Sequence, residues 1–194
     1  MDLNKLRDRA YQAGKAKGFY DKEHSYMYHA MEIIAEIGEA SNADRKGQYA
    51  NKKKFVAIVE SPLIGEDTDM DILHHATFTK TIKDTYEDEV ADSIIVALSV
   101  AGKYNIDLTD AEDMLKGCFP PGLADISRME RLCLSCGTLM DVDTGQQKDI
   151  NEAINYFLAG QIGCAIDEGI DIEWHIEQKM RYNEMRPYLN GKKY

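Results

Sequence analysis

Residues 84–98, DTYEDEVADSIIVAL, place five acidic side chains before and inside an apolar stretch. The helix dipole favours negative side chains in the first turn of a helix, which accounts for some of them. At about 100° per residue, however, Glu89 and Asp92 share a helix face with Val96 and Val100. Two of the acidic side chains are therefore predicted to point where apolar side chains also pack.

A second acidic set lies upstream in HAMEIIAEIGEASNADRKG, where Glu32, Glu36 and Glu39 share a face beside an apolar stripe. If the two helices pack antiparallel, Glu36 and Glu39 face Glu89 and Asp92. Four carboxylates this close repel one another and take up protons unless a cation holds them. Mg²⁺, with Mn²⁺ as its expected substitute, prefers carboxylate oxygens and keeps positions for water and phosphate. We predict that these four residues bind the metal and carry the catalysis.

The other acidic side chains of residues 84–98 have simpler interpretations. Asp84 and Glu87 have the spacing of a capping box, with Asp84 as the cap. Glu87 and Asp88 are expected to face solvent and to stabilise the start of the helix. A plain solvated face is the alternative for the four predicted ligands. A di-iron carboxylate bundle is a further class, but it requires Glu-x-x-His motifs, and the chain contains none.

Composition and charge restrict the class of protein. The chain has 194 residues, 44% of them hydrophobic, and it lacks an apolar run of the length that spans a bilayer. The first residues resemble no secretory signal, so we expect a cytoplasmic protein without a membrane partner. The net charge of −11 argues against a nucleic-acid polymer as partner. A nucleotide stays open, because a metal ion can stand between acidic side chains and phosphates.

The four cysteines are Cys118, Cys133, Cys136 and Cys164. Cys133 and Cys136 have the spacing of zinc ligands, but no second pair completes a set of four. Two buried thiols on a helix are the favoured interpretation.

Helical periodicity dominates and no segment alternates with period two, which predicts a single all-α domain over residues 1–194. Residues 48–69 form an insertion that is partly loop. The expected helices are Asp2 to Lys17, Ser25 as N-cap to Lys46, Met70 to Thr79, Asp84 to Lys103, Thr109 (opening a capping box) to Gly117, Leu123 to Met140, Lys148 to Glu168, and Asp171 to Met185.

The second half of the chain, residues 119–194, resembles the first in weaker form. VADSIIVALSVAGKYNIDL and INYFLAGQIGCAIDEGIDI are both apolar helices that end in similar turns, NIDL and GIDI. This indicates a duplication whose second copy has lost the acidic residues, with Tyr156 or a neighbour in place of Asp92. Two helical hairpins that simply look alike are the alternative.

The motifs EIGE, Glu36 to Glu39, and EVAD, Glu89 to Asp92, resemble the ExxE…ExxD signature of the MazG-like all-α nucleoside triphosphate pyrophosphohydrolases, a superfamily that includes the dimeric dUTPases. The resemblance covers about residues 20–108, within a MazG-like part assigned to residues 1–118. The family often doubles the first acidic residue, whereas Ala35 precedes Glu36 here, and Glu32 is expected to take part of that role. The insertion also lengthens the spacing between the motifs.

The resemblance implies a helical bundle that works as a homodimer and uses Mg²⁺ to hydrolyse a nucleoside triphosphate to monophosphate and pyrophosphate. The substrate would be a deoxynucleotide or a non-standard nucleotide, as in house-cleaning of the nucleotide pool. The C-terminal KMRYNEMRPYLNGKKY is similar to the family's closing Lys/Asn/Arg segment. The expected phosphate and substrate contacts are Lys83, Lys179, Asn183, Arg186 and His24, with Tyr20 and His29 as further candidates for the base.

Three other interpretations stay open. The predicted phosphate contacts can equally form an ordinary helix end, where cations suit the dipole. The chain can also be a non-catalytic helical protein that binds a metal or nucleotide and a protein partner, and within the enzymes a phosphatase that releases orthophosphate is the alternative.

Overall fold

The computed structural model describes residues 1–117, 126–142 and 147–191, and within them it contains helices and no strand, which confirms the predicted all-α class. None of the helices in these ranges is both long and apolar enough to cross a bilayer. The elements are α1 (Leu3–Ala16), α2 (Tyr26–Arg45), α3 (Lys52–Val59), α4 (Met70–Thr81), α5 (Tyr86–Lys103), α6 (Thr109–Lys116), α7 (Arg128–Met140), α8 (Gln147–Asp167), α9 (Ile172–Glu184) and a short 3-10 helix η1 (Tyr188–Gly191).

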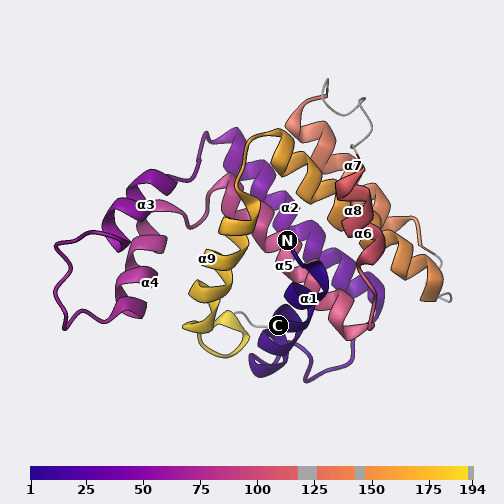
Figure 1. The fold of residues 1–194 in the computed structure, drawn as a ribbon. Helices are drawn as coiled ribbons and strands as arrows, with labels where there is room; N and C mark the ends of the chain where they lie inside the picture. The colour runs from indigo at the N-terminus through magenta and orange to yellow at the C-terminus, as the bar shows by residue number, and fades with distance from the viewer. Residues whose placement is uncertain (118–125, 143–146, 192–194) are drawn as a thin grey trace.

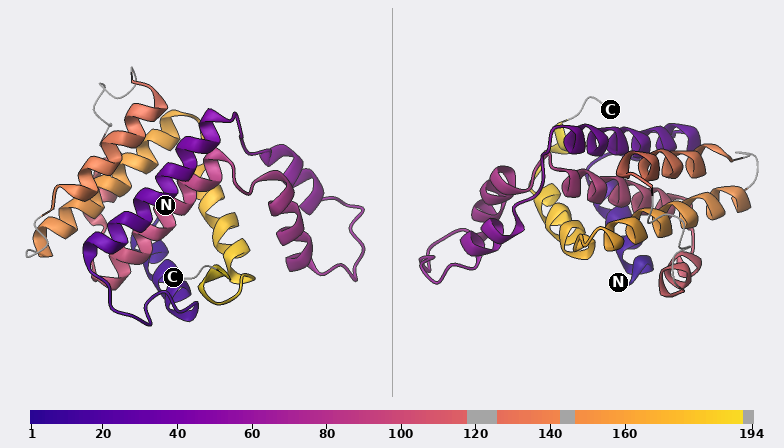
Figure 2. Two further views of the ribbon diagram at one scale, coloured as in Figure 1. Left: turned by 180° about the vertical axis from the view of Figure 1, so that it is seen from behind. Right: turned by 90° about the horizontal axis from the view of Figure 1, so that it is seen from above.

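Helix α5 is the central element, in contact with α1, α2, α8 and α9 (Figure 2). Its side chains are buried on more than one face, as at Val90, Ala91, Ile94 and Leu98. A helix that is apolar around most of its circumference is stable only when other helices cover it. The apolar run that follows the acidic motif therefore places that motif in the middle of the bundle.

Helices α2 and α5 pack antiparallel, which is the arrangement in which the two acidic motifs were expected to face each other. Tyr49, just after α2, contacts Tyr86 at the start of α5 with ring centroids 6.4 Å apart. Tyr26 at the start of α2 contacts Tyr104 just after α5, with centroids 6.3 Å apart. The second half of α2 therefore faces the first turns of α5, which brings the two acidic motifs near each other.

Helices α3 and α4 form a hairpin that stands away from the bundle (Figure 1). The predicted insertion is thus partly helical, with α3 inside it and residues 60–69 outside any helix. Phe55, Phe78, Ile82 and Tyr182 form a hydrophobic cluster of their own, separate from the main core. Because Tyr182 belongs to α9, this cluster attaches the hairpin to the helix that also reaches the acidic motif.

The predicted caps of α5 and α6 are wrong, whereas that of α2 is confirmed at Ser25; Asp2 caps α1. Asp84 has a left-handed backbone with φ of 60°, and Thr85 takes the N-cap position of α5. Before α6, the side chain of Asp107 accepts the backbone N–H of Thr109 at 3.0 Å. The cap interaction thus comes from Asp107, two residues before Thr109. Thr109 is therefore the first residue of α6 and not its cap.

The turns NIDL and GIDI have matching geometry. Asn105 and Gly169 both have positive φ, of 52° and 76°. The following isoleucines donate their backbone N–H groups to Ala101 and Ala165, each at 2.9 Å. The duplication stays a prediction, as does the homodimer. The helix that follows α6 was predicted to start at Leu123. Leu123 and Cys118 lie outside the described residues, and α7 begins at Arg128.

A turn after α1 ties the C-terminal segment to the bundle. Gly18 has φ of 83°, and a Cβ there would lie 2.0 Å from the ring of Tyr188. The Leu189 N–H donates to the Lys17 carbonyl at 2.9 Å, and the Tyr188 hydroxyl donates to Asp21 at 2.5 Å. Glycine is needed here, because a side chain would displace the segment that follows α9.

Acid is expected to destabilise the protein through His175, which is 4% exposed on α9. Burial lowers its pKa to about 4; Lys52 adds to this effect and Asp171 opposes it. The unfolded chain therefore takes up the proton first, so stability is complete above pH 6.5 or so and is lost as the pH falls towards 4. The contribution is about 3 kcal/mol at most. In chemical denaturation, His175→Phe should lose correspondingly less stability on acidification, and an unchanged pH slope would contradict this origin.

Candidate metal centre and adjoining cavity

Three of the four predicted metal ligands lie together. Glu36 from α2 and Glu89 and Asp92 from α5 have carboxylate oxygens that all lie within 4.8 Å of one another. Glu36 is 7% exposed and Glu89 is 4% exposed. Glu39, the fourth, is exposed and lies outside this group, although its charge contributes to the environment of Glu89.

Helix α9 adds a buried cation to this acidic group. The Lys179 ammonium lies 2.8 Å from a carboxylate oxygen of Asp88 and 2.8 Å from one of Asp92. Lys179 and Asp88 are 3% and 1% exposed. Lys179 was predicted to contact phosphate. In the folded chain its ammonium forms ion pairs with two acidic side chains.

The prediction that Asp88 and Glu87 face solvent is wrong. Asp88 is covered by α9. Its carboxylate accepts hydrogen bonds from the Lys179 ammonium and from the Asp84 backbone N–H, the latter at 3.0 Å. Glu87 is partly buried and accepts the backbone N–H of Ala50 at 2.8 Å. The side chains at the start of α5 therefore hold neighbouring segments, which a helical wheel of α5 alone does not show.

Burial raises the pKa values of two acidic side chains at this site, Glu89 and Asp88, and so disfavours their charged forms. Burial raises the pKa of Glu89 to about 8; the Lys179 ammonium opposes this rise, and the carboxylates of Asp88, Asp92 and Glu39 add to it. The pKa of Asp88 is also raised by burial, against the effect of Lys179. These groups thus favour a further positive charge beside them.

The donor set fits a hard divalent cation. Glu36, Glu89 and Asp92 offer carboxylate oxygens, which Mg²⁺ and Mn²⁺ prefer over softer ligands. Two helices of the core position them, so their separation is fixed by packing. Asp92 is shared with Lys179, which orients one of its oxygens.

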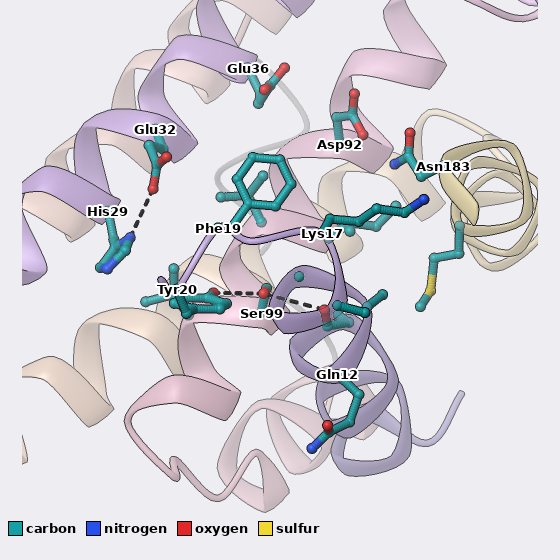
Figure 3. A pocket seen from close by; sticks show the side chains of 18 of the residues that line it. Gln12, Lys17, Phe19, Tyr20, His29, Glu32, Glu36, Asp92, Ser99 and Asn183 are labelled. Carbon is teal, nitrogen blue, oxygen red and sulfur yellow. Dashed lines mark hydrogen bonds and ion pairs between the residues drawn. The ribbon is translucent and has the colours of Figure 1, made fainter. Parts of the chain in front are cut away.

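A cavity of about 900 Å³ adjoins these carboxylates, between α1, α2, α5 and α9 (Figure 3). Glu36 and Asp92 line one side of it, and Glu32 and His29 follow along α2. Much of the remaining wall is apolar or aromatic. These residues include Ala13, Phe19, Tyr20, Tyr28, Ala35, Ile95, Val96, Val100 and Met180.

Cationic and amide side chains line the side of the cavity formed by α1 and α9. Of the predicted phosphate contacts, Asn183 and Arg186 lie here. Lys17 is a lining residue that the sequence analysis missed, and its ammonium donates to the carbonyls of Glu184, at 2.9 Å, and of Arg186. Since a carbonyl is neutral, these two bonds leave the charge of Lys17 in place. No sequence signal joins a lysine at the end of α1 to α9.

The other two predicted contacts lie elsewhere. The Lys83 ammonium pairs with its exposed neighbour Asp84 at 2.6 Å, outside the cavity lining. His24 also lies outside the lining and stacks on Tyr28, with ring centroids 3.8 Å apart. Its contribution is therefore to support an aromatic ring that does line the cavity.

Tyr20 and Ser99 lie side by side in the cavity lining. Their hydroxyls are 2.6 Å apart, and burial raises the pKa of Tyr20. Gly14 makes room for them, because a Cβ there would lie 2.9 Å from the Ser99 oxygen and 3.0 Å from the Tyr20 ring. Tyr20 was among the candidates for contacting a base, whereas Ser99 was not.

Comparison of the chain with protein-family models, with curated proteins and with solved structures finds no significant match. The chemistry of the site is therefore inferred from its own geometry.

Proposed function

We propose that the protein hydrolyses a nucleoside triphosphate to the monophosphate and pyrophosphate, with Mg²⁺ held by Glu36, Glu89 and Asp92. The observation that carries the proposal is the convergence of these three carboxylates, two of which, Glu36 and Asp92, line a cavity of about 900 Å³. A cavity of this size belongs to the range that takes small-molecule ligands.

The charges around the cavity suit a nucleotide. A bound Mg²⁺ would supply positive charge against the phosphate chain and activate water as a nucleophile. Lys17, just after α1, and Arg186, after α9, line the same cavity and can contact phosphate oxygens that the cation does not. The apolar and aromatic remainder of the wall provides surface for a base.

Glu36 is the proposed general base. It lines the cavity at the acidic end, and its carboxylate is fixed on a core helix. The oxygen of a water molecule forms a bond to phosphorus in the α–β anhydride while the bridging phosphorus–oxygen bond breaks. Glu36 accepts the proton of this water, and pyrophosphate leaves.

The proposal is tested by incubating the protein with ribo- and deoxyribonucleoside triphosphates and Mg²⁺, and measuring pyrophosphate and orthophosphate separately. We expect pyrophosphate in a one-to-one ratio with monophosphate, and no activity when a chelator removes the cation. Orthophosphate alone would indicate a phosphatase. Binding of nucleotides without any product would indicate a non-catalytic binding protein.

A further inference from the structure

A chain of three side chains beside the cavity links Lys103 to Glu32. The Lys103 ammonium lies 2.9 Å from Nε2 of His29, and Nδ1 of His29 lies 2.8 Å from a carboxylate oxygen of Glu32. The His29 side chain is 3% exposed and that of Glu32 is 33% exposed. Figure 3 shows His29 and Glu32 side by side on α2, joined by this bond. Neither residue belongs to the group of three carboxylates.

The direction of these hydrogen bonds follows from their ends. A lysine ammonium only donates, so Nε2 of His29 must accept. The remaining ring nitrogen, Nδ1, then carries the hydrogen and donates it to Glu32. Glu32 is thereby held as an acceptor, and it retains lone pairs for hydrogen-bond donors that enter the cavity it lines.

The position of Glu32 suits contact with a base. It lies one turn from Glu36, about 6 Å along α2, and His29 lies about 10 Å from Glu36. At this end of the cavity the wall includes the rings of Tyr20 and Tyr28. Tyr20 lies against His29, with ring centroids 5.8 Å apart. Aromatic faces of this kind stack on bases.

We propose that Glu32 selects the base of the nucleotide by accepting a hydrogen bond from an exocyclic amino group. Adenine, cytosine and guanine carry such a group, whereas uracil and thymine carry only carbonyl oxygens as exocyclic polar groups. A carboxylate oxygen repels a carbonyl oxygen that faces it, because neither of these two atoms can donate a hydrogen bond to the other. The protein therefore takes amino-bearing bases and rejects uracil and thymine. This inference depends on the proposed nucleotide site.

The sharpest test compares cytosine with uracil, which differ in the amino or carbonyl group at one ring position. Calorimetric titration should give dCMP an affinity at least about tenfold higher than dUMP, since a hydrogen bond to a charged acceptor discriminates by that order. The same ratio is expected in kcat/KM for dCTP over dUTP. Binding of the monophosphates is measured in the presence of a chelator, so that it needs neither the cation nor turnover.

The Glu32→Gln variant tests whether Glu32 causes the preference for dCMP over dUMP. The amide can present either a donor or an acceptor, so the ratio of dCMP to dUMP affinity should fall to within about threefold of unity. Glu23→Gln is the matched control, because Glu23 lies 3.4 Å from the Lys103 ammonium but outside the cavity lining. That variant should keep the wild-type ratio.

The outcomes separate this inference from the proposed function. Equal or tighter binding of dUMP by the wild type, or a preference that survives Glu32→Gln, would overturn the role of Glu32 while pyrophosphate release could still be observed. A preference for dCMP that disappears in Glu32→Gln, in a protein that releases no pyrophosphate, would support the role of Glu32 and overturn the hydrolase. Failure of every monophosphate to bind would overturn the base site.

Discussion

Glu89→Gln is expected to lower kcat/KM for pyrophosphate release by about two to three powers of ten, because a lost metal ligand removes several kcal/mol of transition-state stabilisation. Affinity for Mg²⁺ should fall as well, which calorimetry measures without any substrate. Glu89 lies on α5, and its carboxylate is close to those of Glu36 and Asp92. A change at this position therefore acts directly on the acidic site.

The fold is expected to tolerate this change. Burial raises the pKa of Glu89 to about 8, so the side chain is readily accommodated in its neutral form, which glutamine matches in shape. Far-ultraviolet circular dichroism and the midpoint of urea unfolding should stay close to wild type. Glu66→Gln, which changes an exposed acid in the hairpin loop, is the control. Unchanged kinetics and Mg²⁺ affinity in Glu89→Gln would show that the wrong face of α5 has been assigned.

Lys179→Met is expected to have the largest effect on stability, lowering the free energy of unfolding by about 3 to 5 kcal/mol. The ammonium is buried between Asp88 and Asp92, 2.8 Å from each. Its removal leaves two carboxylates without the cation that holds them, one of them fully buried. Urea denaturation measures the loss, with the exposed Lys53→Met as control.

The same variant distinguishes two roles for Lys179. A lysine that only contacts phosphate would reduce activity and leave the stability of the free protein unchanged. A lysine that holds the acidic group lowers stability even without substrate, and adding Asp88→Asn to Lys179→Met should restore part of the loss. Mg²⁺ should also stabilise the Lys179→Met variant more than the wild type, because a second cation can then replace the missing charge. A loss below about 1 kcal/mol would contradict the holding role.

Much of the helical framework could be predicted from local signals. Ser25 caps α2 and Lys46 ends it, because both follow from propensities that act within one turn. The antiparallel pairing of α2 and α5 was only a condition of the predicted metal site, because matching acidic faces do not by themselves fix which helices pack together. The caps predicted at Asp84 and Thr109 were wrong. Asp84 itself has a left-handed backbone, and the side chain of Asp107 bonds to Thr109, so the cap positions differ from those that the spacing predicts.

The spacing of the acidic residues by itself determined that Glu36 shares a helix face with Glu39 and Glu89 with Asp92, since periodicity sets which side chains share a face. The packing of α2 on α5 decided that Glu36 meets Glu89 and Asp92 while Glu39 stays exposed. Only the tertiary structure decided that Asp88 is also buried, because α9, some ninety positions away, covers that face and delivers Lys179. It likewise decided that Lys17, Glu32 and Arg186 border one cavity. A helical wheel orients side chains within one helix, whereas the partners they meet depend on which distant helices pack against it.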